Sequence, residues 1–175
     1  MSVLALVPAR GGPKGIPRKN LVPVAGRPLL WWSVRHGLDA GAVDRVVVST
    51  DDEEIAACAR DAGAEVPFLR PAALAGDDVT DLPVFQHALR WLDEHDGWQP
   101  EIVVHLRPTS PVRPAGLVDE VVGRLRATPT ATSVRSVTPL AHPPHKLWWT
   151  DDDGWLQPIC GTLEEERFNL PRQAL

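Results

Sequence analysis

The sequence has few of the cysteines that stabilise small domains through disulfides or bound metal ions. Only two of its 175 residues are cysteines, Cys58 and Cys160. Two cysteines at this separation do not match the spacing of a metal cluster and do not supply a disulfide framework. Cys58 lies in an alanine-rich helical pattern, where we expect it to act as a small, buried apolar residue.

Long apolar runs and an excess of positive charge are also missing. The apolar stretch at 3–7 is too short for a membrane span or for the core of a signal peptide, and no basic residue precedes it. We therefore expect a cytoplasmic protein. Lysine and arginine number 18 against 23 aspartates and glutamates, which gives a net charge of −5. This balance, without a nucleic-acid motif, argues against a partner that is nucleic acid or membrane.

Short apolar runs alternate with helical patterns along the chain. Each run is typical of a strand buried on both faces, and each helical pattern repeats its apolar residues at helical spacing. A hairpin is predicted at 145–159, with its turn at Asp151 to Gly154. Strands are predicted at 3–7, 44–50, 101–106 and 131–140, and helices at 27–41, 51–65, 81–95 and 115–128.

This order of elements predicts an α/β fold, a Rossmann-like and mostly parallel sheet with helices on both faces. The length fits a single domain, 1–175, in which the segment 138–175 holds the hairpin. Polar segments follow three predicted strands, at 8–12, 49–52 and 107–111. Because ligands of open parallel sheets bind at the carboxyl ends of the strands, we expect these segments to meet in one site.

The stretch "LVPARGGPKGIPRKNL" (6–21) combines glycines with several cations. Glycine lets the backbone approach an anion, and cations over such a loop suit a polyphosphate. The stretch is not a Walker A loop, and Pro17 and Pro23 exclude the helix that follows a dinucleotide-binding motif. Charge alone leaves a solvated basic loop open as the alternative. The cations are Arg10, Lys14, Arg18 and Lys19, and the glycines are Gly11, Gly12 and Gly15.

Four motifs together resemble one family. They are "PARGGPKGIPRKNL", "STDDEEIAACARDAGAEVPFLRPAALAGD", "HLRPTSPVR" and "HPPHKLWW". In this order and spacing they resemble the acylneuraminate cytidylyltransferases, which are sugar-acid cytidylyltransferases of the nucleotide-diphospho-sugar transferase fold. The resemblance implies a nucleotidyltransferase that moves CMP from CTP to the hydroxyl of an acidic sugar, releases pyrophosphate and uses Mg²⁺.

The resemblance also implies roles for individual residues. Arg10 and Lys19 would hold the triphosphate, with Lys19 nearest the α-phosphate, and Asn20 and Arg70 would help hold the cytidine. Members are typically homodimers, so that part of one subunit reaches the neighbour's site. Further nucleotide contacts are implied for Ala9, Gly11, Gly12 and Lys14, and contacts to the acidic substrate for Arg107, Thr109, Ser110, Lys146 and Arg172.

Three features depart from the family pattern. Pro13 stands where the family usually has serine, which removes a hydroxyl and a backbone N–H from the loop. Arg107 replaces a glutamine beside the sugar acid, and its guanidinium offers a fork for a carboxylate, phosphate or phosphonate unless it faces outward. After "LPRQAL" the family continues to a further strand and an acidic pair that binds magnesium, so we expect a fold truncated at its C-terminal part.

The magnesium ligands are therefore unassigned. Asp51 and Asp52 are expected to cap the helix that follows them. Asp77 and Asp78 lie in a loop that could approach the nucleotide. His105 ends a predicted strand and either lines the site or is a hydrogen-bonded interior histidine.

The tryptophans leave two possibilities for the hairpin. Trp148, Trp149 and Trp155 either form an interface or cover the domain's own core. Trp31 and Trp32 begin a predicted helix and are expected in the core.

Two alternatives to CMP transfer onto an acidic sugar stay open. One is a cytidylyltransferase for a phosphonate or another secondary-metabolite acid, which the guanidinium of Arg107 would suit. The other is a non-catalytic nucleotide-binding module, which the missing acidic pair would explain.

Overall fold

The structure is a computed structural model that describes residues 1–12, 15–138, 144 and 147–160. The chain divides into two compact units, Met1–Val134 and Arg135–Leu175. The boundary between them lies close to residue 138, the first residue of the predicted hairpin segment.

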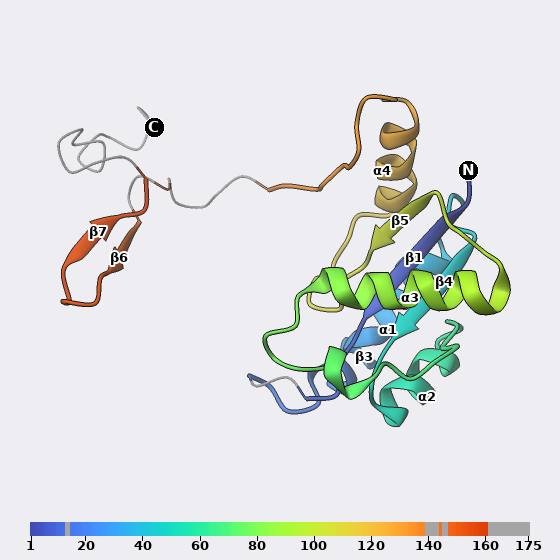
Figure 1. The fold of residues 1–175 in the computed structure, drawn as a ribbon, viewed down its shortest axis with the longest axis horizontal. Helices are drawn as coiled ribbons and strands as arrows, with labels where there is room; N and C mark the ends of the chain where they lie inside the picture. Colours follow the sequence, from blue (N-terminus) through green and yellow to red (C-terminus); the bar gives the residue numbers. More distant parts are fainter. Residues whose placement is uncertain (13–14, 139–143, 145–146, 161–175) are drawn as a thin grey trace. The chain divides into compact units, whose positions relative to one another are not determined.

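A three-stranded parallel sheet forms the centre of the first unit (Figure 1). Its middle strand is β1 (Val3–Pro8), which pairs with β4 (Arg45–Ser49) on one side and β5 (Ile102–His105) on the other. Two isolated parallel bridges continue the sheet beyond β4, from Val47 to Glu65 and from Thr50 to Leu69. The predicted parallel sheet is confirmed, although β5 is only half-buried because it is an edge strand in the described part of the chain.

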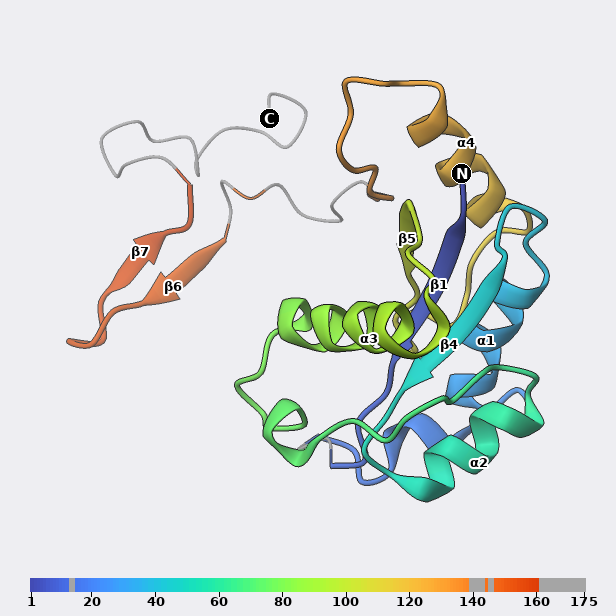
Figure 2. The ribbon, with the colours of Figure 1, turned by 45° about the vertical axis from the view of Figure 1, so that its right-hand side comes forward.

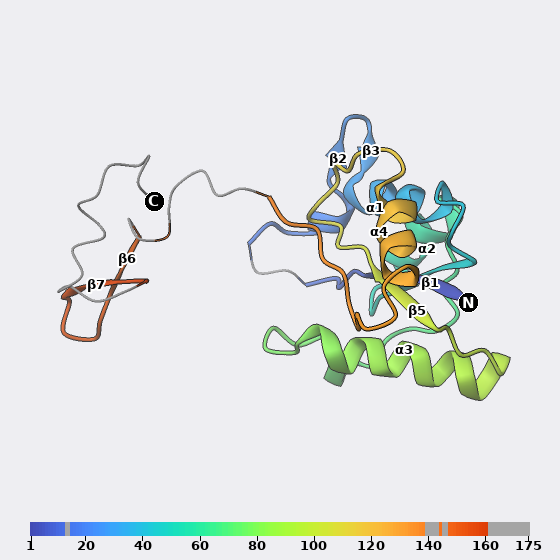
Figure 3. The ribbon, with the colours of Figure 1, turned by 90° about the horizontal axis from the view of Figure 1, so that it is seen from above.

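Helices cover both faces of this sheet, as predicted (Figure 2). Alternate residues of β1 face opposite sides: Ala5 and Val7 join one apolar cluster, and Leu4 and Leu6 join the other. The first cluster packs against α1 (Leu29–Leu38), α2 (Glu53–Asp61) and α4 (Leu117–Arg126), and the second against α3 (Asp81–Asp96). Figure 3 shows α3 alone on its side of the sheet.

The helix ends follow local chemistry. Asp52 caps α2 as predicted, because its carboxylate accepts from the backbone N–H groups of Glu54 and Ile55. Asp51 was expected to share this role and does not, since it turns towards the loop after β1. Helix α1 ends at Leu38, before the glycine at which the predicted helix stops.

Short elements fill the connections of the first unit. Trp31 packs against the core, and Trp32 is half-buried and donates to the Val24 carbonyl at 2.9 Å. Cys58 is half-buried against the same cluster, and burial raises the pKa of its thiol. The remaining elements are η1 (Lys19–Leu21), β2 (Pro23–Val24), β3 (Arg27–Pro28) and η2 (Ala72–Leu74). Across the described residues, no helix is both long enough and apolar enough to span a membrane.

The predicted strand at 131–140 is wrong for the residues that can be described there. Residues 131–138 form no strand, and most of them are exposed. A strand needs a ladder of backbone hydrogen bonds, and the apolar residues of this stretch find no neighbouring strand in the described part of the structure.

The predicted hairpin is confirmed in the second unit. Strands β6 (Trp148–Thr150) and β7 (Leu156–Pro158) pair antiparallel. The turn lies where it is predicted, since the backbone N–H of Gly154 donates to the Asp151 carbonyl at 3.0 Å. Trp149 and Trp155 are 52% and 72% exposed, so the hairpin itself does not bury them.

Candidate functional site

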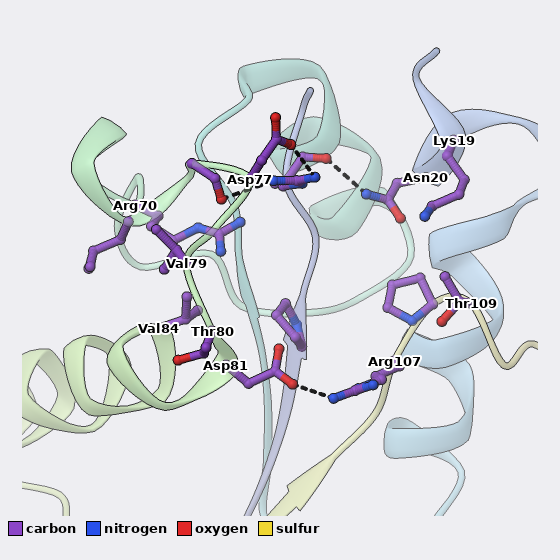
Figure 4. Close-up of a pocket in the computed structure, with 15 residues that line it drawn as sticks. Lys19, Asn20, Arg70, Asp77, Val79, Thr80, Asp81, Val84, Arg107 and Thr109 are labelled. Atoms are coloured by element: carbon purple, nitrogen blue, oxygen red, sulfur yellow. Dashed lines mark hydrogen bonds and ion pairs between the residues drawn. The ribbon is translucent and has the colours of Figure 1, made fainter. Parts of the chain in front are cut away.

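A pocket of about 290 Å³ opens at the carboxyl ends of β1 and β5 (Figure 4). Three segments line it: the end of β1 with its following loop, residues 70–84, and the turn after β5. In Figure 4, Lys19 and Thr109 lie on one side, and Arg70 and Val79 on the opposite side. Two of the three polar segments predicted to meet here, 8–12 and 107–111, line the pocket, whereas 49–52 does not and contacts the first segment through Asp51 and Gly11. The polar residues that line the pocket include Arg10, Lys19, Asn20, Arg70, Asp77, Thr80, Asp81, Arg107 and Thr109.

The loop after β1 is held in place by its own side chains. Asn20 is 5% exposed, and its amide donates to the Arg10 carbonyl at 3.0 Å. The Arg10 guanidinium then reaches the opposite wall, where it donates to the Gly76 carbonyl at 2.9 Å and pairs with Asp77 at 2.6 Å. Lys19, the residue directly before Asn20, also lines the pocket. Arg10 and Lys19 therefore present two cations to one cavity.

Other residues of this loop lie outside the pocket lining. The N–H of Ala9 donates to the Ser49 carbonyl at 3.0 Å, and the N–H of Gly11 donates to Asp51 at 3.0 Å. Gly12 is exposed. Arg18 turns towards α2, where it pairs with Glu54. The N–H groups of Ala9 and Gly11 are thus occupied by the protein itself.

Arg70 is a buried cation with spare hydrogen-bonding capacity. It is 6% exposed, and its nearest carboxylate is Asp51, at 3.6 Å from Nη2. Its Nε and Nη2 atoms have no hydrogen-bond partner. Burial lowers the pKa of Arg70, the nearby charge of Arg10 lowers it further, and Asp51 opposes both. Arg70 lines the pocket, but these two nitrogens are enclosed by protein atoms, so a ligand acceptor would engage them only after the guanidinium turns towards the cavity.

Arg107 lies at the mouth of the pocket, and its side chain is also 61% exposed to solvent. It lines the cavity and pairs with Asp81, the first residue of α3. Thr109 and Ser110 are both exposed, and of the two only Thr109 lines the cavity. The loop of Asp77 was expected near the nucleotide, but the pairing of Asp77 with Arg10 and of Asp81 with Arg107 was not predicted. Both pairs join residues far apart in the chain, so no local pattern could reveal them.

Three predicted contacts cannot be located. Lys14, Lys146 and Arg172 lie outside the described residues, as does Pro13.

The described residues form no preassembled cluster of metal ligands. They contain no group of three or more His, Cys, Asp or Glu side chains that could hold a metal ion. The carboxylates at the pocket are engaged with cations: Asp77 with Arg10, Asp81 with Arg107. Magnesium prefers several oxygen ligands in octahedral geometry. We therefore assign no step of the proposed reaction to a metal.

His105 sits beneath this site as an interior histidine. Its ring lies edge-on to Phe85, with 4.7 Å between ring centroids, and its Nε2 atom has no hydrogen-bond partner. Burial lowers the pKa of His105; Asp81 opposes this shift, while Arg107 and Arg113 add to it. His105 is not among the residues that line the pocket.

This lowered pKa predicts a loss of stability in mild acid. The unfolded chain takes up the proton near pH 6.5, whereas folded His105 resists it. The free energy of unfolding is therefore expected to decrease as the pH falls below about 6.5. His105→Phe keeps an aromatic ring against Phe85 and removes the titration. Urea unfolding at pH 7.5 and 5.5 should show a smaller decrease for this variant, and equal decreases would contradict the assignment.

Gly11 is required by the close approach of its loop to α2. A Cβ at this position would lie 2.8 Å from the Asp52 Cβ, whereas one at Gly12 would meet nothing within 4 Å. Gly11→Ala would displace Asp52 from its cap, which should lower the free energy of unfolding by about 1–2 kcal/mol. Gly12→Ala is the matched control and should change it little. Urea denaturation of both variants checks this, and equal stabilities would contradict it.

An open parallel sheet with a cationic pocket at its carboxyl edge is typical of nucleotide-binding α/β domains. Within this class, residues 4–146 match the family model described as cytidylyltransferase, and the chain belongs to this family.

Its curated relatives include several cytidylyltransferases. The chain is 42% identical over 96 residues to a pseudaminic acid cytidylyltransferase of Campylobacter jejuni, covering 55% of this chain and 41% of the relative. It is 34% identical over 154 residues to the CMP-N,N'-diacetyllegionaminic acid synthase of Legionella pneumophila, covering 88% and 65%. The matched region is thus less than two thirds of each relative's length.

A solved structure shares the fold. It is that of a CMP:2-keto-3-deoxy-manno-octonic acid synthetase complexed with CTP, with a TM-score of 0.62 and 18% identity. The match covers 74% of this chain and 49% of that one. At this identity the likeness supports the nucleotidyltransferase-type fold.

Proposed function

We propose that this protein transfers CMP from CTP to the hydroxyl of an acidic sugar of the nonulosonic or sialic type and releases pyrophosphate. The observation that carries the proposal is the convergence of Arg10, Lys19, Arg70 and Arg107 on one pocket at the carboxyl edge of the sheet. A net-negative protein that gathers cations in one cavity is suited to polyanionic ligands.

The reaction needs charge stabilisation more than proton transfer. The acceptor oxygen forms a bond to the α-phosphorus of CTP, and the bond from that phosphorus to the bridging oxygen of pyrophosphate breaks. Negative charge grows on the leaving group, so fixed cations lower the barrier. Arg10 and Lys19 are proposed to bind the triphosphate, with Lys19 nearest the α-phosphate. Arg10 would exchange its contact with Asp77 for a phosphate oxygen.

The nucleoside is proposed to lie against Arg70 and Asn20. A turn of the Arg70 guanidinium towards the pocket would let Nε and Nη2, which lack a partner among the described residues, donate to acceptor atoms of cytidine. Asn20 supports this site by fixing the Arg10 carbonyl. A ligand that satisfies Arg70 would relieve the penalty of burying its donors.

The acceptor is proposed to bind at Arg107 and Thr109. A guanidinium can hold a carboxylate through two parallel hydrogen bonds, and the hydroxyl of Thr109 can donate to a sugar oxygen. Because a guanidinium also suits a phosphonate, an acceptor of that class is the second candidate. Lys146 and Arg172 as further contacts, magnesium as cofactor and a homodimer stay predictions. The exposed Trp149 and Trp155 support the homodimer.

Pyrophosphate release from CTP, measured on the full-length protein across a panel of acids, tests the proposal. Turnover with a nonulosonic acid supports it, and turnover with phosphonates alone supports the second candidate. ATP, GTP and UTP with the same acids are the controls for the base. Binding of CTP without turnover of any acid would contradict the proposal and indicate a non-catalytic nucleotide-binding module.

A further inference from the structure

One backbone carbonyl beside the pocket accepts three hydrogen bonds. It belongs to Arg107, and its donors are the Ser33 hydroxyl at 3.1 Å, the Arg113 Nη2 at 2.8 Å and the backbone N–H of Ser110 at 3.1 Å. The first two donors come from outside the turn 107–110. The direction of the Arg107 peptide is therefore set by other parts of the fold and not by the turn alone.

The same side chains bond to each other. Arg113 Nη1 donates to the Ser33 Oγ at 3.2 Å, so the serine hydroxyl accepts from one residue and donates to another. Ser33 is fully buried in α1, and Arg113 is half-buried. His36, one turn further along α1, contacts the Pro111 carbonyl through Nε2 at 3.0 Å. Residues three apart share a helix face, so α1 holds this segment at two points.

None of these three side chains lines the pocket, yet the segment they hold carries two that do, Arg107 and Thr109 (Figure 4). We propose that Arg113 and Ser33 are positioning residues that fix the Arg107–Ser110 turn and so set the affinity for the acidic acceptor. This inference rests on the proposed function. The Arg107 side chain is held at its far end by Asp81, and its backbone is held by the Ser33–Arg113 pair.

Arginine and lysine are not equivalent in this place. The guanidinium bonds Arg107 and Ser33 through two nitrogens at once, whereas an ammonium group is a single point of attachment. Arg113→Lys should keep one of the two bonds and Arg113→Ala neither. The series wild type, Arg113→Lys, Arg113→Ala should therefore show a graded effect. Ser33→Ala removes the Ser33 hydroxyl, a different donor to the Arg107 carbonyl, and leaves the Arg113 side chain in place.

Steady-state kinetics of the full-length protein test this inference. The KM for the acidic acceptor is expected to rise about tenfold in Arg113→Ala and less in Arg113→Lys, with the KM for CTP changed less than twofold. Ser33→Ala should shift the same constant in the same direction. Arg124→Lys is the matched control, because Arg124 pairs with Glu120 on the exposed face of α4. Equal changes in both KM values would overturn the inference.

Amide hydrogen exchange provides a readout that needs no turnover. The N–H of Ser110 donates to the carbonyl that Arg113 holds, so its exchange is expected to accelerate in Arg113→Ala. Unchanged exchange would overturn the positioning role. If the wild type shows no transfer to any acid, the proposed function fails, and the exchange experiment still decides whether Arg113 fixes the turn.

Discussion

Replacement of Lys19 by alanine is expected to lower kcat by ~10²–10³-fold, to the point where turnover is lost in ordinary assays. Lys19 lines the pocket next to Asn20 and is the cation proposed to lie nearest the α-phosphate. An ammonium group there would stabilise charge that grows only as the bond to pyrophosphate breaks. Its removal should therefore reduce kcat more than it raises the KM for CTP.

Pyrophosphate release with saturating CTP and acceptor measures this effect. Arg35→Ala is the matched control, since it removes an exposed cation that pairs with Asp39 along α1. Thermal melting should be the same for Lys19→Ala and the wild type, because Lys19 is not part of the apolar core. Near-normal pyrophosphate release by Lys19→Ala, with the fold intact, would refute the assignment.

Replacement of Arg70 by methionine is expected to weaken CTP binding and to leave the free protein equally or more stable. A hydrogen bond to a charged group contributes about 1.5–3 kcal/mol, so the Kd for CTP should rise about 10- to 100-fold. In the absence of nucleotide, however, Arg70 is a buried charge with two unpartnered nitrogens. An apolar side chain of similar length removes that penalty, and Asp51, which lies 3.6 Å from Nη2, is partly exposed and keeps its hydrogen bond from Gly11.

The opposite directions of the two effects distinguish this prediction from general damage to the fold. Calorimetric titration with CTP gives the affinity, and thermal melting without ligand gives the stability. Arg70→Lys is the comparison variant, because it keeps the charge but presents fewer donors. A large fall in melting temperature together with unchanged CTP affinity would show that Arg70 is structural.

Much of the fold could be predicted from local pattern. The apolar run at 3–7 contains the residues of a strand buried on both faces, and β1 is that strand. Helix α2 begins directly after Asp52, which local capping chemistry favours as its N-cap. The hairpin turn lies at Asp151 to Gly154. In each case the controlling interaction joins residues a few positions apart. Such interactions can be inferred from spacing alone.

The strand predicted at 131–140 shows where local pattern is insufficient. Its apolar and β-branched residues favour an extended chain, but a strand also requires a neighbour with free backbone groups. Residues 131–138 have no such partner among the described segments. The cap predicted for Asp51 is wrong for a related reason: the fold places Gly11 of the loop after β1, and Arg70 from a different segment, within reach of its carboxylate.

The sequence by itself determined the alternating strands and helices, the cationic glycine loop and the motifs that place the chain among the cytidylyltransferases. All of these depend on residues close together in the chain. Only the tertiary structure decided which polar side chains meet: the ion pairs of Arg10 with Asp77 and of Arg107 with Asp81, and the hydrogen bond from Arg113 to Ser33. The physical reason is that these pairs join separate elements, and their distance is set by how helices pack on the sheet.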